Sequence, residues 1–195
     1  MTCAPTSQLL KPTKISSSLI QRAEALLRKM RGGVSKSFFS TDPVSHKGAT
    51  NVWLTPKWLL DELGEFDLDP CAAPNPRPFP TAKKMITEAD ECGLKASWHG
   101  RVWLNPPYGK QIGPWLEKLK SHGDGIALVF ARTETNWLQP IMEVTGIFFL
   151  KGRIKFLRPD GSEETNAGAP SILLPFGRKN IAAILASNLK GVWKP

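Results

Sequence analysis

A short apolar strand that runs into a proline-rich loop and then into a helix constrains this chain more than any other feature. We predict a strand over 101–104, a loop over 105–109 and a helix whose apolar residues repeat every three or four positions from Ile112 to Leu119. In open α/β sheets, a loop of this kind leaves the carboxyl end of its strand, where such folds bind ligands. The segment therefore predicts an α/β domain with a ligand site at residues 105–109.

The alternation of short strands and helices extends from Val52 towards the C-terminus. We predict a helix after Thr55-Pro56, with Thr55 as N-cap and Pro56 at its first position, followed by a strand over 66–70. The other predicted strands cover 125–131, 146–150 with a continuation over 153–157, and 171–176, and the other helices lie near 137–144 and 181–189. This order is typical of an α/β domain.

The loop Asn105-Pro106-Pro107-Tyr108 carries the candidate chemistry. An amino group conjugated to a ring is a poor nucleophile, because its lone pair is delocalised, and two acceptors that take one N–H each can turn that lone pair out of the ring plane. The side-chain oxygen of Asn105 and the carbonyl of Pro106 are such acceptors, and the two prolines fix their direction. Tyr108 offers an aromatic face to a base. These four residues are candidate catalytic residues, and an ordinary proline-rich turn is the alternative.

Positive charge gathers in the first fifty residues. The chain has a formal net charge of +9, and residues 1–50 hold eight Lys or Arg against two acidic side chains. A short amphipathic helix is predicted there from Leu19 to Met30. The arm favours a polyanionic partner; a helix docked on the main domain, a solvated tail and an organelle transit peptide are the alternatives. We therefore divide the chain into a basic N-terminal arm, 1–50, and a main domain, 51–195.

Composition argues against several other classes of protein. The three cysteines form no C-x-x-C pair, which favours reduced thiols and no structural metal. No apolar run is long enough to cross a bilayer, and the N-terminus lacks a secretory signal. We expect a cytoplasmic protein without a metal or a membrane partner.

Several motifs occur in a consistent order around the loop. They are Trp53-x-Thr55-Pro56, Asp67-Leu68-Asp69-Pro70, Thr87-Glu88-Ala89-Asp90 with Gly93-Leu94 and Trp98, Trp103 to Gly109, and Gly152 to Phe156. Together they resemble the phage-type DNA N-6-adenine methyltransferase (Dam) family. The resemblance implies transfer of a methyl group from S-adenosylmethionine to DNA adenine, by a phage- or prophage-encoded enzyme in the cytoplasm of a bacterial host.

The resemblance also implies a cofactor site. Trp53, Thr55 and Pro56 belong to it, with Thr55 on the methionine carboxylate. Asp69, at the end of the first strand, lies beside the methionine moiety, and Asp90 faces the adenine amino group of the cofactor. For both aspartates a helix cap or a surface turn is the alternative.

Two departures from common methyltransferases bear on the fold. Residues 71–75 replace the expected glycine-rich turn, and only 35 residues lie between Asp69 and Asn105. That is too few for the usual run of βα units. We therefore expect an abridged Rossmann-like sheet with flanking helices, accompanied by the basic arm.

Access to a paired base adds a requirement for nucleic-acid contacts. The base must be flipped out of a duplex or presented on a single strand. Arg132, Arg153 and Lys155 are candidates for DNA backbone contacts, with plain surface charges as the alternative. RNA adenine and the glutamine amide of a protein remain possible substrates of the same loop, and a non-catalytic nucleic-acid-binding module is the non-enzyme alternative.

Overall fold

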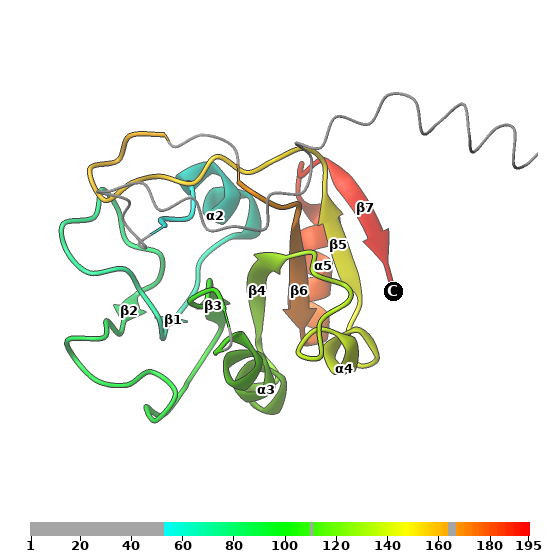
Figure 1. Ribbon diagram of the computed structural model, residues 1–195, viewed down its shortest axis with the longest axis horizontal. Helices are drawn as coiled ribbons and strands as arrows, with labels where there is room; N and C mark the ends of the chain where they lie inside the picture. The colour runs from blue at the N-terminus through cyan, green and yellow to red at the C-terminus, as the bar shows by residue number, and fades with distance from the viewer. Residues whose placement is uncertain (1–52, 110, 164–166) are drawn as a thin grey trace, which may run out of the picture. The chain divides into compact units, whose positions relative to one another are not determined.

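The computed structural model describes residues 53–109, 111–163 and 167–195, and these ranges contain four helices and seven strands (Figure 1). The helices are α2 (Lys57–Leu63), α3 (Ile112–His122), α4 (Gln139–Met142) and α5 (Arg178–Ala186). The strands are β1 (Leu68–Asp69), β2 (Lys84–Met85), β3 (Val102–Leu104), β4 (Gly125–Phe130), β5 (Ile147–Leu150), β6 (Ser171–Phe176) and β7 (Gly191–Lys194). The boundary predicted between residues 1–50 and 51–195 and the helix predicted over 19–30 lie outside these ranges.

The strands form one mixed sheet in the order β2-β1-β3-β4-β6-β5-β7. The first four pair in parallel, whereas β6 runs antiparallel to both β4 and β5, and β7 runs antiparallel to β5. Strand β5 therefore points the same way as β4. As a result, the carboxyl ends of β1 to β5 lie at one edge of the sheet, which we call the carboxyl edge.

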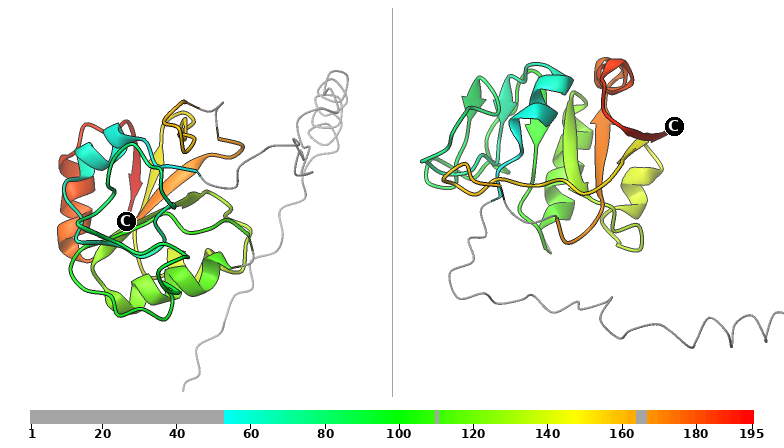
Figure 2. Two further views of the ribbon diagram at one scale, coloured as in Figure 1. Left: turned by 90° about the vertical axis from the view of Figure 1, so that its left-hand side faces the viewer. Right: turned by 90° about the horizontal axis from the view of Figure 1, so that it is seen from above.

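Two apolar layers cover the sheet because side chains alternate along each strand. Trp103 of β3 faces α2 and α5, while its neighbours Val102 and Leu104 face α3 and α4. Figure 2 shows the two helix pairs on opposite sides of the sheet. Helix α2 buries Leu59, Leu60 and Leu63, and each buried leucine stabilises the fold by roughly 1.5–3 kcal/mol. The predicted α/β sheet with flanking helices is confirmed.

The connection between β1 and β3 is short, as the spacing predicted. Within it lies one two-residue strand, β2, and residues 70–101 contain no helix. This strand was not predicted, because Lys84 and Met85 show no apolar alternation of their own. Strand β7 was also missed, because its four residues carry only two apolar side chains between glycine and lysine.

Two local predictions were wrong. Residues 153–157 form no strand, only isolated bridges from Leu157 to Leu54 and to Glu163. Ile154 and Phe156 are buried in alternation, but this reflects packing against the α2 side of the core. Helix α2 begins at Lys57, with Pro56 as an extended N-cap and no side-chain cap. Thr55 does not cap it, because the hydroxyl of Thr55 contacts Asn105.

Candidate active site

The side chain of Asn105 lies at the carboxyl edge, directly after β3. Its Nδ2 donates to the carbonyl of Trp53 at 3.3 Å and to Oγ1 of Thr55 at 3.4 Å. Both distances are long for N–H···O bonds, so each contact alone would hold the amide only weakly. The two contacts together orient it. Oδ1 of Asn105 is buried and has no hydrogen-bond partner among the described residues. The amide is thus held by its nitrogen, with its acceptor unused.

Asp69 and Cys71 connect the end of β1 to the same loop. The Asp69 carboxylate accepts from the hydroxyl of Thr81 and from the Cys71 amide at 3.1 Å. The Cys71 thiol donates to the carbonyl of Asn105 at 3.2 Å. Burial raises the pKa of Asp69 to about 6, against lowering contributions from the Thr81 and Cys71 hydrogen bonds. Burial also raises the pKa of the Cys71 thiol, which stays protonated and able to donate.

Tyr108 lies face to face with Phe130, the last residue of β4. The two ring centroids are 4.2 Å apart and the planes differ by 15°. Phe156 meets Phe130 edge on, with centroids 6.5 Å apart. The Tyr108 hydroxyl is buried without a hydrogen-bond partner among the described residues, and burial raises its pKa. The ring is therefore fixed by stacking, and its hydroxyl takes no part in that fixation.

The remaining loop residues and the Thr-Pro element differ in their exposure. Pro106 is buried and Pro107 exposed. Thr55 is only 2% exposed, and Pro56 beside it is buried as well. The structure thus brings Trp53 and Thr55 into contact with Asn105, although they precede it by about fifty residues, and Pro56 follows Thr55 directly.

Asp90 lies on an exposed turn just beyond β2. Its carboxylate accepts from the hydroxyl and the amide of Thr87 at 2.7 and 2.9 Å, and these bonds lower its pKa. The Arg77 guanidinium lowers the pKa of both Asp69 and Asp90, so both carboxyls lie within its electrostatic reach. Asp90 makes no hydrogen bond to the Asn105 loop, and the turn conformation accounts for its contacts with Thr87.

The three predicted DNA-contacting cations lie on segments that follow the carboxyl ends of β4 and β5. All three are exposed. Lys155 pairs with Glu163 at 3.0 Å, and Nη1 of Arg153 lies 3.5 Å from the carbonyl of Ala167. Arg132 accepts, through its own carbonyl, the amide and hydroxyl of Thr135. The fold therefore places these cations on the same edge as Asn105, with the charge of Lys155 partly balanced by Glu163.

Sequence reasoning missed three residues of this site. Phe130 was assigned only to a strand, Cys71 only to a replaced turn, and Thr81 had no assignment. The unbroken apolar run of β4 gave no indication that the ring of its last residue would stack on Tyr108. Nothing in the sequence around Thr81, which follows a proline-rich stretch, indicates its bond to Asp69 twelve residues earlier.

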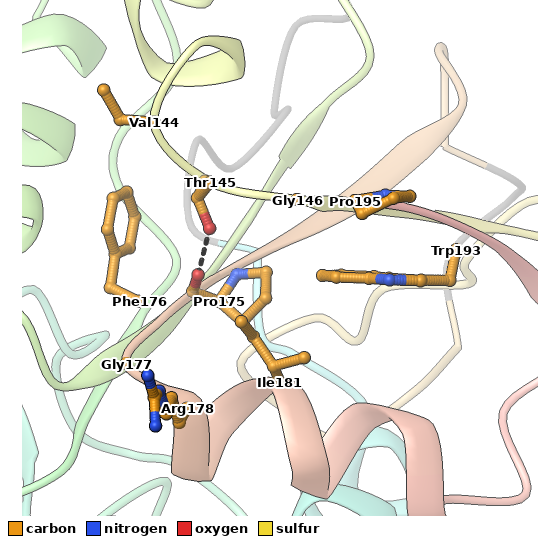
Figure 3. A pocket seen from close by; sticks show the side chains of 10 residues that line it. All are labelled: Val144, Thr145, Gly146, Pro175, Phe176, Gly177, Arg178, Ile181, Trp193 and Pro195. Atoms are coloured by element: carbon orange, nitrogen blue, oxygen red, sulfur yellow. Dashed lines mark hydrogen bonds between the residues drawn. The ribbon is translucent and has the colours of Figure 1, made fainter.

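A pocket of about 360 Å³ lies at the opposite edge of the sheet, between the start of β5 and the end of β6. Trp193, Pro175 and Ile181 line it, and the Thr145 hydroxyl donates to the carbonyl of Pro175 beside it (Figure 3). It contains none of the predicted site residues. In the described ranges, no group of three or more His, Cys, Asp or Glu could hold a metal ion. No helix of these ranges is long and apolar enough to span a membrane.

An Asn-Pro-Pro-Tyr loop at the carboxyl edge of such an α/β sheet is typical of methyltransferases that act on amino nitrogens. The family model described as DNA N-6-adenine-methyltransferase (Dam) matches residues 43–189, and the chain belongs to this family. Comparison with curated proteins and with solved structures gave no match. Family membership implies DNA as the substrate and methylation of adenine N6 as the activity.

Proposed function

We propose that this chain transfers the methyl group of S-adenosylmethionine to the N6 amino group of an adenine that is flipped out of DNA or lies on a single strand. The observation that carries the proposal is the unused acceptor of Asn105, whose amide nitrogen is held by Trp53 and Thr55. A buried carbonyl oxygen without a donor is costly. An adenine amino group would supply the missing N–H.

Each residue of the loop then has a separate role. Oδ1 of Asn105 and the carbonyl of Pro106 each accept one N–H of the amino group, which turns its lone pair out of the ring plane. The nitrogen must release one proton, and solvent takes it, because both acceptors are neutral. The Tyr108 ring, already stacked on Phe130, offers the base a fixed aromatic surface. Such a stack contributes about 1–3 kcal/mol in nucleic-acid complexes.

The donor set at the ends of β1 and β2 fits S-adenosylmethionine, which supplies an electrophilic methyl group when bound. Its sulfonium and ammonium groups are cationic, and its adenine carries an amino group, so carboxylates and carbonyl oxygens suit it. The Asp90 carboxylate is held ionised by Thr87, and Asp69 stands at the end of β1. We assign Asp69, Asp90 and the segment Trp53-Leu54-Thr55-Pro56 to this ligand, with Thr55 also orienting Asn105.

DNA binding has to offset the cost of exposing the base, which is a few kcal/mol. We assign Arg132, Arg153 and Lys155 to the phosphates, because all three are exposed at the edge that holds Asn105. The resemblance to phage-type enzymes further supports a phage- or prophage-encoded protein acting in the cytoplasm of a bacterial host.

One experiment tests the reaction and the substrate together. The protein is incubated with S-adenosylmethionine and unmethylated DNA, RNA or bulk protein, and the digests are analysed by mass spectrometry. We expect 6-methyladenine in DNA, reduced by on the order of 100-fold or more in Asn105→Ala, as for loss of one preorganised group at a reacting centre. Methylation confined to RNA or to glutamine would overturn the choice of substrate. No methylation by wild-type protein would overturn the proposed activity.

A further inference from the structure

A hollow of about 260 Å³ lies on the α2 side of the sheet, away from the layer of α3 and α4. Trp58 and Glu62 of α2 form one wall. Leu150 at the end of β5, with Lys151, Arg153 and Ile154 after it, forms the second, and residues 188–190 before β7 form the third. Its lining includes the apolar side chains of Leu150, Ile154 and Leu189. The hollow therefore has a partly apolar lining that is built from three separate segments of the chain.

Trp58 is the most unusual residue of this hollow. It is 51% exposed, whereas the next two residues of α2 are buried against the sheet. Among the exposed large hydrophobic side chains of the described residues, it is the only aromatic one. A tryptophan in this position leaves about half of its surface exposed to solvent. Exposed aromatic rings are enriched where proteins bind partners.

Three cations line the same hollow as Trp58. The amide of Lys151 donates to the carbonyl of Lys190 at 2.8 Å, so these two lysines are backbone neighbours, and Arg153 follows two residues later. None of the three forms an ion pair with another described residue. Glu62 is the only acid among the described residues of the lining. It accepts from the amide of Asn188 at 2.8 Å and from its Nδ2 at 3.2 Å. The hollow thus has an excess of positive charge.

Two segments of the hollow continue along the chain to residues that hold the Asn105 loop. Trp58 comes three residues after Thr55, which contacts Asn105. Arg153 belongs to the segment that reaches Leu157, and Leu157 pairs with Leu54. An exposed aromatic ring combined with unpaired cations is the arrangement with which proteins bind unpaired nucleic-acid strands.

We propose that this hollow, which we call the Trp58 hollow, binds an unpaired DNA segment that flanks the target adenine. One base stacks on Trp58, and the phosphates next to it bind Lys151, Arg153 and Lys190. An unpaired segment is required, because the bases of an intact duplex offer no free face to the ring. The inference rests on the proposed function, since it supplies a second contact for the same strand.

Binding of a fluorescently labelled single-stranded DNA, followed by anisotropy between about 50 and 200 mM salt, tests the hollow. Trp58→Ala should lower the affinity by roughly 5- to 150-fold without changing the salt slope, and Trp58→Phe should recover most of it. Lys151→Ala/Lys190→Ala should make the slope of log K against log salt shallower by about 1.4, the value for two phosphates on a single strand. The matched control is Arg178→Ala/Lys179→Ala, which removes two exposed charges at the opposite edge and should leave the slope unchanged.

Several outcomes would overturn the inference. The inference is wrong if Trp58→Ala binds DNA with wild-type affinity, or if the control pair changes the salt slope as much as Lys151→Ala/Lys190→Ala does. It is also wrong if the substitutions in the hollow weaken binding of RNA but not of DNA. A parallel assay of 6-methyladenine by the wild-type protein separates the two proposals. If the wild type methylates DNA while the variants bind it normally, only the Trp58 hollow is wrong. If the wild type produces no 6-methyladenine, the proposed function itself fails.

Discussion

The side-chain nitrogen of Asn105 lies 3.3 Å from the main-chain oxygen of Trp53, and this contact determines which end of the amide is free. A carbonyl oxygen can only accept a hydrogen bond, so the amide must present its NH₂ group to Trp53. Oδ1 then points the other way. The residue that carries the proposed chemistry is therefore oriented by a segment fifty residues earlier in the chain.

Thr55→Val tests this orientation. The substitution keeps the shape of the side chain and removes the oxygen that accepts from Asn105, so the amide retains one partner. We expect kcat to fall about 3- to 10-fold, in keeping with the loss of one hydrogen bond. Thr55→Ser keeps the hydroxyl and should stay close to wild type. Equal rates for Val and Ser, with normal unfolding curves for both, would show that this hydroxyl does not position Asn105.

Asp69 should make the stability of the fold depend on pH. Its pKa is raised from 3.8 to about 6 by burial, so between these values the folded state binds a proton that the unfolded state lacks. The contribution of Asp69 to stability therefore falls as the pH rises through this window, by roughly 3 kcal/mol in all. Asp69→Asn should raise the free energy of unfolding at pH 8 and flatten its dependence on pH between 4 and 6, as measured by urea denaturation.

Asp90→Asn is the matched control for this measurement. The pKa of Asp90 is lowered by its bonds from Thr87, so its contribution has the opposite sign: it is present above its ordinary pKa and is lost as the pH falls. A gain of stability at pH 8 should appear in Asp69→Asn and not in Asp90→Asn. An Asp69→Asn variant that is less stable than wild type at pH 8 would contradict the cost assigned to burial.

Tyr108→Phe should retain much of the activity, because the hydroxyl of Tyr108 has no partner among the described residues and the stack with Phe130 remains. Tyr108→Ala removes the ring and should lower kcat/KM by roughly 5- to 150-fold, the equivalent of one base–aromatic stack. Steady-state kinetics on DNA distinguishes the two variants. Equal losses in both would mean that the hydroxyl itself contacts the substrate.

Gly93 should tolerate no side chain. A Cβ at this position would lie 1.8 Å from the carbonyl oxygen of Pro70, and main chain cannot move aside as a flexible side chain can. Gly93→Ala should lower the free energy of unfolding by about 1–3 kcal/mol, as overpacking does. Gly109→Ala is a useful comparison, because a Cβ there meets nothing within 4 Å, although its φ of 113° adds backbone strain. The prediction fails if the unfolding midpoint of Gly93→Ala equals that of wild type.

The sequence predicted those parts of the molecule that depend on local spacing. The strand before Asn105 and the helix through Leu116 follow from runs of apolar residues, and both are present. Contacts between distant segments could not be predicted in this way. The bond from Asn105 to Thr55 spans fifty residues, and the stack of Tyr108 on Phe130 depends on the register of two strands. The residues that hold the loop in place therefore emerged only from the structure.

The isolated bridge between Leu54 and Leu157 connects the segment that holds Asn105 to the segment that contains Arg153. Leu54 lies between the two residues that hold Asn105, and Leu157 ends the segment 151–157, which we call the basic segment because it carries Lys151, Arg153 and Lys155. The two backbones exchange hydrogen bonds of 2.9 Å in both directions. We therefore expect two binding equilibria to be linked: binding of phosphate to the basic segment and binding of a base to the Asn105 acceptor. By reciprocity, each ligand then changes the affinity for the other by the same factor.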